Sequence, residues 1–276
     1  MRRNKLSRAN AIVSDLLSQI QDNFFVKCEF FISFYLHYFL KALGITFTKF
    51  PTLNVKMDGV NYRTRKNTID FWVVWKRYEN DITEFLRDLP DNKGVFIDVG
   101  AHIGRFSALM GVKNWDVYSF EPMSTTYNQL ITNMGFNNIS ANFHGFNYGL
   151  GNAPSSQTIY FSGYKTGEAS FTHSEGTSSE ETVKIDTFEN LVKDSFVGRD
   201  VVLKIDVEGF EHQVIEGMKN TIQEVKPLMI LELWKENSEN ITQFLYSLGY
   251  VNHVLYWFPP DSPHKEYFRK KYGWKI

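Results

Sequence analysis

Residues 95–104, with the sequence VFIDVGAHIG, constrain the fold of this chain more than any other segment. A β-branched and aromatic run carries the carboxylate Asp98, and two glycines then lead into a stretch with apolar residues at helical spacing. This pattern predicts a buried strand, a tight turn and a helix. Because glycine lacks a Cβ and a helix N-terminus presents free N–H groups, the corner indicates a nucleotide-type ligand site. We expect Asp98, Gly100 and Gly104 to contact the ligand.

A second carboxylate follows the next predicted strand. Residues 117–120 are VYSF, and Glu121 comes directly after them. A carboxylate at this place can accept hydrogen bonds from both hydroxyls of a ribose. The dinucleotide-binding pattern has a glycine where this chain has His102, which argues against a pyrophosphate. The residues therefore favour a ligand with a ribose and no phosphate, S-adenosylmethionine, and the predicted cofactor site also includes His102, Pro122, Met123 and Asn147.

The rest of the chain alternates predicted strands with helical patterns. This alternation favours a doubly wound parallel sheet. Two of the later strands again end in acids, at Asp206 and at Glu232, and Glu208 and Gly209 follow the first of them. Strands are expected near residues 95–99, 117–121, 139–144, 201–206, 228–232 and 250–257, and residues 145–185 are expected to form an inserted β-rich or loop region.

Five of these segments, in order over roughly residues 94–235, closely resemble the FkbM-type S-adenosylmethionine-dependent methyltransferases. The segments are IDVGAHIG (97–104), FEP (120–122), IDTF (185–188), KIDVEGFE (204–211) and ILE (230–232). The resemblance implies an α/β, class I methyltransferase (Rossmann-like) fold with S-adenosylmethionine as cofactor. It also implies methylation of a hydroxyl of a sugar in a glycan, glycolipid or glycosylated metabolite.

Three alternatives stay open at this point. The same fold can act on a carboxylate, such as that of a uronic acid, or on a natural-product hydroxyl. A nicotinamide-dependent dehydrogenase has a similar sheet, although His102 and the acid-rich strand before Asp206 count against it. The third alternative is a methyltransferase-like scaffold without activity.

Methylation of a sugar hydroxyl benefits from a positioned base that removes the proton. Asp206 is the first candidate, and its alternative role is the N-cap of a helix starting near Glu208. Glu208 faces either the site or the solvent. At 100° per residue, Glu211 falls on the apolar face of the following helix and His212 points away from it, so His212 is either a surface histidine or a base that reaches the acceptor.

Carboxylates suit Mg²⁺, and Asp206, Glu208 and Glu232 are expected near one another. Acids at strand ends are nevertheless common in proteins without a metal. We therefore predict no metal ligands.

Composition narrows the class of partner. The chain has 276 residues with 30 basic and 31 acidic side chains, which gives a formal charge of −1. Nucleic-acid binding normally requires a basic excess or a basic face, so no nucleic-acid partner is predicted. The single cysteine, Cys28, cannot form an internal disulfide, which fits a cytoplasmic location.

The domain organisation is predicted as three parts. Residues 1–50 form a helical N-terminal extension, residues 51–93 a hairpin and a helix that lead into the core, and residues 94–276 the methyltransferase domain. The hairpin is predicted from Asp58-Gly59 between alternating runs in 52–64, and the helix over 68–89. The extension begins with basic residues and continues into an aromatic run that is too short to span a bilayer. It is either a cap packed on the core or a partner, or an interfacial helix that makes peripheral membrane contact through residues 1–45.

Overall fold

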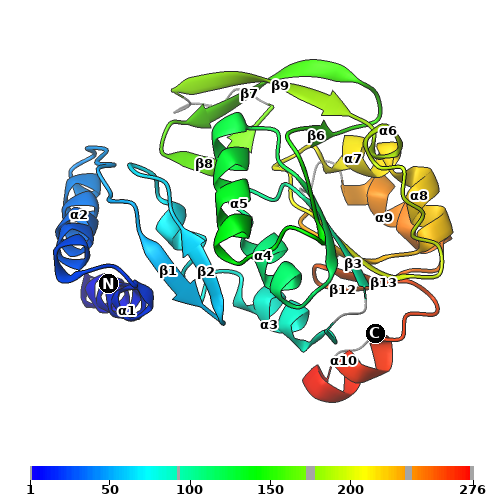
Figure 1. Ribbon diagram of the computed structural model, residues 1–276, viewed down its shortest axis with the longest axis horizontal. Coiled ribbons are helices and arrows are strands. Elements are labelled where there is room, and N and C mark those ends of the chain that lie inside the picture. Colours follow the sequence, from blue (N-terminus) through cyan, green and yellow to red (C-terminus); the bar gives the residue numbers. More distant parts are fainter. Residues whose placement is uncertain (1, 92–93, 172–177, 234–237, 274–276) are drawn as a thin grey trace.

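The computed structural model describes residues 2–91, 94–171, 178–233 and 238–273. In Figure 1, two N-terminal helices lie at one edge of the molecule, a β-hairpin follows them, and a central sheet with helices forms the main body. A second, smaller sheet covers one end of this body. None of the described helices is both long and apolar enough for a transmembrane span.

The central sheet has seven strands in the order β12-β13-β11-β10-β3-β4-β5. Five of them pair in parallel, and they are β3 (Gly94–Val99), β4 (Asp116–Phe120), β5 (Phe143–Phe146), β10 (Asp200–Ile205) and β11 (Leu228–Leu231). The hairpin of β12 (Val251–His253) and β13 (Tyr256–Phe258) is added antiparallel at one edge. The predicted α/β fold with a doubly wound sheet is confirmed.

Apolar side chains cover both faces of this sheet. In β3, Phe96 belongs to one hydrophobic cluster, whereas Val95 and Ile97 belong to the other. This alternation follows from the period of two along a strand, and burial on both faces explains the nearly continuous apolar run. The helices next to the parallel strands are α4 (Arg105–Val112), α5 (Ser124–Phe136), α7 (Glu211–Gly217), α8 (Lys219–Val225) and α9 (Ser238–Ser247), and α10 (Lys265–Tyr272) ends the described chain.

The region predicted as a β-rich or loop insertion over 145–185 forms most of the second sheet. Its strands are β6 (Gly149–Leu150), β7 (Ser155–Ser162), β8 (Lys165–Ser170) and β9 (Ser179–Asp186), in the order β6-β9-β7-β8. The short helix α6 (Phe188–Leu191) follows β9 and leads back to the central sheet. This sheet covers the carboxyl-terminal side of β3 and β4, where the cavity described below lies.

The N-terminal extension packs on the core. It consists of α1 (Arg2–Gln19) and α2 (Phe24–Ala42), followed by the hairpin β1 (Asn54–Met57) and β2 (Val60–Arg63). The turn at Asp58 and Gly59 has two positive φ angles, as the Asp-Gly pair predicts. Buried side chains of α1, α2 and the hairpin belong to the same hydrophobic cluster as those of α4.

Three predicted elements differ from the structure. The strand expected at 139–144 lies at 143–146, and the strand expected at 250–257 is a hairpin of two short strands. The helix expected over 68–89 is divided into a 3-10 turn, η1 (Asp70–Trp72), and α3 (Asn80–Asp88). Glu79 has a left-handed φ of 44°, and this backbone conformation interrupts the helical path despite the favourable apolar spacing.

Candidate functional site

A cavity lies where the direction of the strand order reverses. The chain proceeds from β3 to β4 and β5 on one side, and it then returns to β10 on the other side of β3. The carboxyl ends of β3, β4 and β10 therefore surround one crevice, the usual ligand position in open α/β sheets. Its wall includes Asp98, Glu121 and Asp206, three of the predicted site residues.

The two predicted glycines have different roles. Gly100 lines the cavity and has a φ of 82°, and a Cβ on it would lie 1.9 Å from the backbone oxygen of Asp206. Only glycine allows the ends of β3 and β10 to approach so closely. A Cβ on Gly104 would lie 2.3 Å from Leu130 Cδ1 on α5. Gly104 is not among the residues that line the cavity, and its contact with a ligand stays a prediction.

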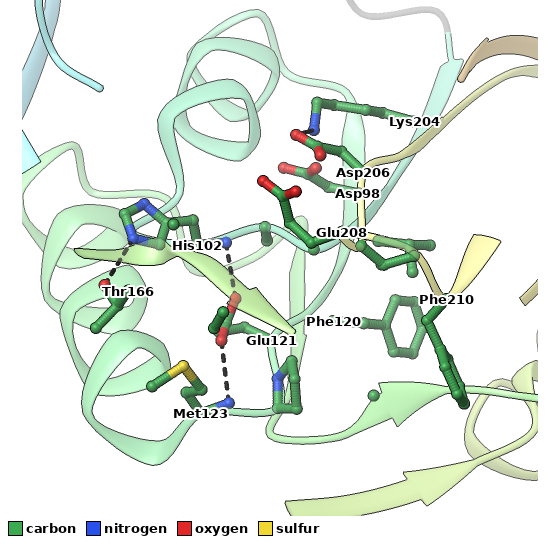
Figure 2. Close-up of a pocket in the computed structure, with 18 of the residues that line it drawn as sticks. Asp98, His102, Phe120, Glu121, Met123, Thr166, Lys204, Asp206, Glu208 and Phe210 are labelled. Carbon is green, nitrogen blue, oxygen red and sulfur yellow. Dashed lines mark hydrogen bonds and ion pairs between the residues drawn. The ribbon is translucent and has the colours of Figure 1, made fainter. Parts of the chain in front are cut away.

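Glu121 is buried and held by the backbone (Figure 2). Its Oε2 accepts the His102 N–H at 3.0 Å, and its Oε1 accepts the Met123 N–H at 3.0 Å. Burial raises the pKa of the Glu121 carboxyl to about 7, against the lowering effect of these two hydrogen bonds. Each oxygen keeps a further lone pair for a hydroxyl donor, so this side chain is fixed in place before a ligand arrives.

Asp98 is also buried, and one of its oxygens has no protein partner. Ser107 Oγ donates to Oδ2 at 2.5 Å, and Ser107 in turn contacts Ser119 Oγ at 2.8 Å. Among the described residues, Oδ1 has no hydrogen-bond partner. Burial raises the pKa of Asp98. A buried acceptor without a partner is costly, and a bound ligand that donates to Oδ1 would remove this cost.

His102, which lines the cavity, forms a polar network with Arg65. The Arg65 guanidinium donates to both oxygens of buried Asp70 at 2.8 and 2.9 Å. It also donates to Thr166 Oγ1 at 2.5 Å and lies 3.3 Å from His102 Nε2. Burial lowers the pKa of His102 to about 4, so the ring is neutral at neutral pH. The network joins the hairpin, the glycine corner and β8.

Asp206 pairs with a buried lysine (Figure 2). Lys204 Nζ lies 3.0 Å from Asp206 Oδ2. Although burial alone lowers the pKa of Lys204, the carboxylates of Asp206 and Asp98 hold it above its usual value. The alternative role of Asp206 as a helix N-cap is wrong, because α7 starts only at Glu211 and its N-cap position is Phe210. Asp206 is thus oriented by a charge pair at the cavity wall.

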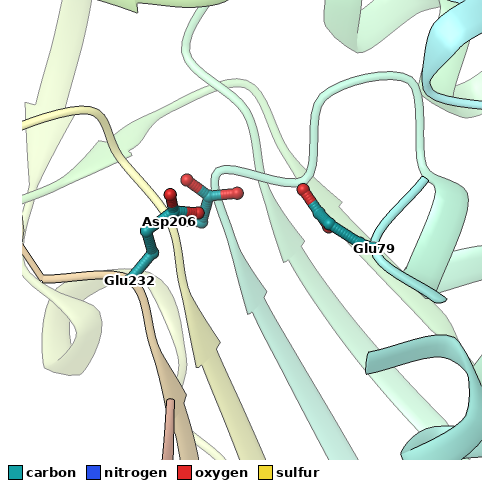
Figure 3. A group of neighbouring side chains, drawn as sticks. All are labelled: Glu79, Asp206 and Glu232. Atoms are coloured by element: carbon teal, nitrogen blue, oxygen red, sulfur yellow. The ribbon is translucent and has the colours of Figure 1, made fainter. Parts of the chain in front are cut away.

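Three carboxylates come together beside this pair. In Figure 3, Glu79, Asp206 and Glu232 approach one another from three segments. Each offers an oxygen within 4.8 Å of the others. Burial raises the pKa of both Glu79 and Glu232. A divalent cation could be held here by oxygen ligands, but the Lys204 ammonium already supplies positive charge next to Asp206.

The structure brings some of the remaining predicted residues to the cavity. Pro122, Met123 and Glu208 line it. Glu208 has a left-handed φ of 51°, a conformation that is uncommon outside glycine. The sequence placed Glu208 beside Asp206 and Glu232 as a third possible metal ligand. In the structure the third carboxylate of that group is Glu79.

Other predicted residues lie elsewhere. Glu211 is buried, as the helical geometry predicts, and its Oε1 accepts the Gly209 N–H at 2.9 Å. His212 is half-buried on α7 and is not among the residues that line the cavities described here. Asn147 also stands outside the lining, and its side-chain amide donates to the backbone oxygens of Glu121 and Pro122 at 2.9 Å. Asn147 thus supports the strand end that carries Glu121.

A second cavity adjoins the first. Its wall combines α2, the segment around η1, and the β7–β8 turn, and its aromatic residues are Tyr38, Trp72, Tyr78 and Tyr164. The residues that line both cavities are Val73, Tyr78, His102, Thr166, Gly167 and Glu208. Two ligands, one bound in each cavity, would come into contact at this shared wall.

Sequence reasoning missed the residues that lie outside the strand ends. Arg65, Tyr78, Glu79 and Thr166 come from loops or from the second sheet, and no motif marks them. Asp70, five residues after Arg65, is the one local signal that could have indicated a role for Arg65. A carboxylate that is buried requires a partner, and Arg65 is that partner.

Comparison with known proteins assigns the family. The model described as "Methyltransferase FkbM domain" matches residues 98–251. The hexuronic acid methyltransferase AglP of Haloferax volcanii is 30% identical over 161 residues, which cover 57% of this chain and 65% of that protein. The match therefore spans less than two thirds of this relative's length.

Two solved structures have lower similarity. An FkbM methyltransferase from Methylobacillus flagellatus is 16% identical with a TM-score of 0.43, and 61% of this chain and 44% of that chain are covered. The M. jannaschii TYW2 structure in complex with AdoMet is 13% identical with a TM-score of 0.42, and 77% and 85% are covered. The family model matches more than half of this chain, so the chain belongs to the FkbM methyltransferase family.

Proposed function

We propose that this chain is an S-adenosylmethionine-dependent methyltransferase and that it transfers the methyl group to an oxygen atom of a sugar. The observation that carries the proposal is the junction of two cavities at Tyr78, His102 and Thr166. One cavity has acids at strand ends, which suit a nucleoside, and the other has four aromatic side chains, which suit the apolar face of a sugar ring. The AglP relative, named as a hexuronic acid methyltransferase, supports a saccharide acceptor.

The residues of the first cavity fit the cofactor. Glu121 would accept the ribose hydroxyls, because the backbone N–H groups of His102 and Met123 already fix both of its oxygens. Asp98 Oδ1 would accept a hydrogen bond from a donor group of the cofactor and would lose its unpartnered state. Pro122 and Met123 would border the adenine ring of the cofactor. When bound, S-adenosylmethionine supplies an electrophilic methyl group on a sulfonium.

For a hydroxyl acceptor, we propose Asp206 as the base. Lys204 Nζ lies 3.0 Å from its carboxylate, and Asp206 lines the first cavity. A base contributes because a neutral sugar hydroxyl is a poor nucleophile. Glu208, which lines both cavities, would orient the acceptor rather than the cofactor. His212 has no part in this proposal, since it stands outside both cavities.

An acidic sugar is the second candidate acceptor. Lys41 and Lys165 line the second cavity, and either ammonium could pair with a uronate carboxylate. If the carboxylate itself receives the methyl group, no base is needed, because the nucleophile carries no proton. Asp206 would therefore act as a base for a hydroxyl acceptor, whereas a carboxylate acceptor would need no base.

The test is a methyl-transfer assay with isotopically labelled S-adenosylmethionine. The purified chain would be incubated with matched neutral and hexuronic-acid glycosides, and the products would be analysed by mass spectrometry. Mild alkali would then be applied, because it cleaves a methyl ester and leaves a methyl ether intact. Transfer to at least one saccharide supports the proposal. If binding of S-adenosylmethionine is normal and no saccharide is labelled while non-sugar hydroxyls are, the proposed acceptor is wrong.

A further inference from the structure

The outer face of α2 is apolar and exposed. Phe25, Ile32 and Phe39 lie seven residues apart on one side of the helix, with exposed fractions of 80%, 64% and 63%. At 1.5 Å per residue they extend over about 21 Å. Other exposed apolar residues of α2 and the segment after it are Phe24, Phe31, Leu36, Leu43 and Ile45. We call this set the outer stripe.

The opposite face of α2 explains why this helix keeps its position. Phe30 and Phe34 are buried, and the rings of both contact Phe71. His37 on the same face is also buried. The helix is therefore fixed on the core through one face while the outer stripe remains in solvent, at the edge of the molecule in Figure 1. Exposed apolar patches of this kind usually mark a binding surface.

The charge of the N-terminal segment that contains the stripe favours an anionic surface as its partner. Residues 1–49 contain seven basic and three acidic residues. Asp15, one of the acids, is already neutralised by Lys76 and Arg77 at 2.9 Å each. Within α2 the only acid is Glu29, against the two lysines Lys27 and Lys41, and Lys41 also lines the second cavity. A helix with bulky apolar side chains in a segment with a basic excess can insert between the headgroups of anionic lipids.

We propose that α2 docks this methyltransferase on an anionic lipid bilayer through the outer stripe. The helix lies in the plane of the interface and does not cross it. Resting on the proposed function, one consequence concerns the acceptor. His37, Tyr38 and Lys41 of α2 line the second cavity, so that cavity lies about one helix diameter, 10–12 Å, from the bilayer. A saccharide attached to a lipid of that bilayer would reach it.

The experiment is flotation of the full chain with vesicles of phosphatidylcholine alone or mixed with phosphatidylglycerol. We expect binding to the mixed vesicles, weaker binding to the neutral ones, and at least a tenfold loss of affinity in the double variant Ile32→Glu/Phe39→Glu. The matched control is Val197→Glu/Val254→Glu, whose parent side chains have exposed fractions of 63% and 75% and lie outside α2. The control should bind like the parent chain.

Light scattering and calorimetry complete the test. If the parent chain binds neither kind of vesicle, or if the control variant loses as much affinity for the mixed vesicles as the α2 variant, the proposal is wrong. A dimer that becomes a monomer in the α2 variant, without vesicle binding by the parent chain, would assign the stripe to a second copy instead. Calorimetric titration with S-adenosylmethionine is measured without vesicles, so failure of membrane docking is distinguished from failure of the cofactor site.

Discussion

The proposed cofactor side and the proposed acceptor side of the site are built in different ways. In the first cavity, the proposed cofactor side, Asp98, His102 and Glu121 come from one short stretch of chain at the ends of β3 and β4, and backbone N–H groups fix Glu121. The second cavity, the proposed acceptor side, combines α2, the loop around η1 and the β7–β8 turn, which are far apart in the sequence. The proposed site for the cofactor is thus local in the sequence and prearranged. Specificity for the acceptor would instead depend on the tertiary packing of distant segments.

The largest expected effect separates the two acceptor chemistries. If the acceptor is a hydroxyl, Asp206→Asn should lower kcat by about 10²–10⁴-fold, because the base for its proton is lost. The dissociation constant of S-adenosylmethionine should change far less. Initial rates at saturating acceptor, together with calorimetric titration of the cofactor, give both numbers.

A carboxylate acceptor gives a different result for the same variant. Its kcat should then fall by less than about tenfold, since no proton has to be removed. Glu224→Gln, on the exposed surface of α8, is the control for loss of one carboxylate. A large loss of cofactor affinity in Asp206→Asn would contradict its assignment to the acceptor chemistry.

The next effect concerns the cofactor side alone. Glu121→Gln keeps the shape of the side chain but replaces one acceptor oxygen with an amide that cannot accept the adjacent N–H. Hydrogen bonds to a charged group are worth about 1.5–3 kcal/mol, so the dissociation constant of S-adenosylmethionine should rise about 10–100-fold. The KM of the acceptor should stay within about threefold. Equal losses on both sides would show that the two halves of the site are not separable at Glu121.

The pH dependence of cofactor binding sharpens the same assignment. Burial raises the pKa of Glu121 to about 7 in the cofactor-free protein, and in the proposed site its ionised form would accept the ribose hydroxyls. Protonation therefore competes with binding as the pH falls through 7. We expect roughly tenfold weaker binding at pH 6 than at pH 8. Calorimetry at the two pH values measures it, and Glu121→Gln should remove most of the difference.

Sequence patterns could predict residues that line the first cavity because their signals are local. The strand around Asp98, the corner at Gly100 and the acid at Glu121 follow from periodicity and the conformational needs of one turn. Glu211 is likewise predicted as buried from helical geometry alone, and it is.

The acceptor side could not be predicted, because long-range contacts create it. Arg65 meets Thr166 across 101 residues of sequence, and no local pattern encodes that distance. Glu79 lies beside Asp206 and Glu232 in the structure. It has a left-handed backbone conformation, which interrupts the continuous helix expected over 68–89. At Gly104 the motif suggested a ligand contact, whereas the structure shows that packing against Leu130 by itself requires a glycine there.

The smallest expected effect tests whether the Arg65 network belongs to the acceptor side. Arg65→Lys keeps the positive charge near Glu121 but loses the planar fork that donates to Asp70 and Thr166 at once. Loss of one hydrogen bond of about 0.5–1.5 kcal/mol should raise the KM of the acceptor about 3–10-fold. The dissociation constant of S-adenosylmethionine should stay within about twofold. The control is Arg63→Lys, an exposed arginine at the end of β2. If cofactor binding weakens as much as the acceptor KM rises, Arg65 supports the whole mouth of the site through His102, and the boundary between the two sides must be moved to include it.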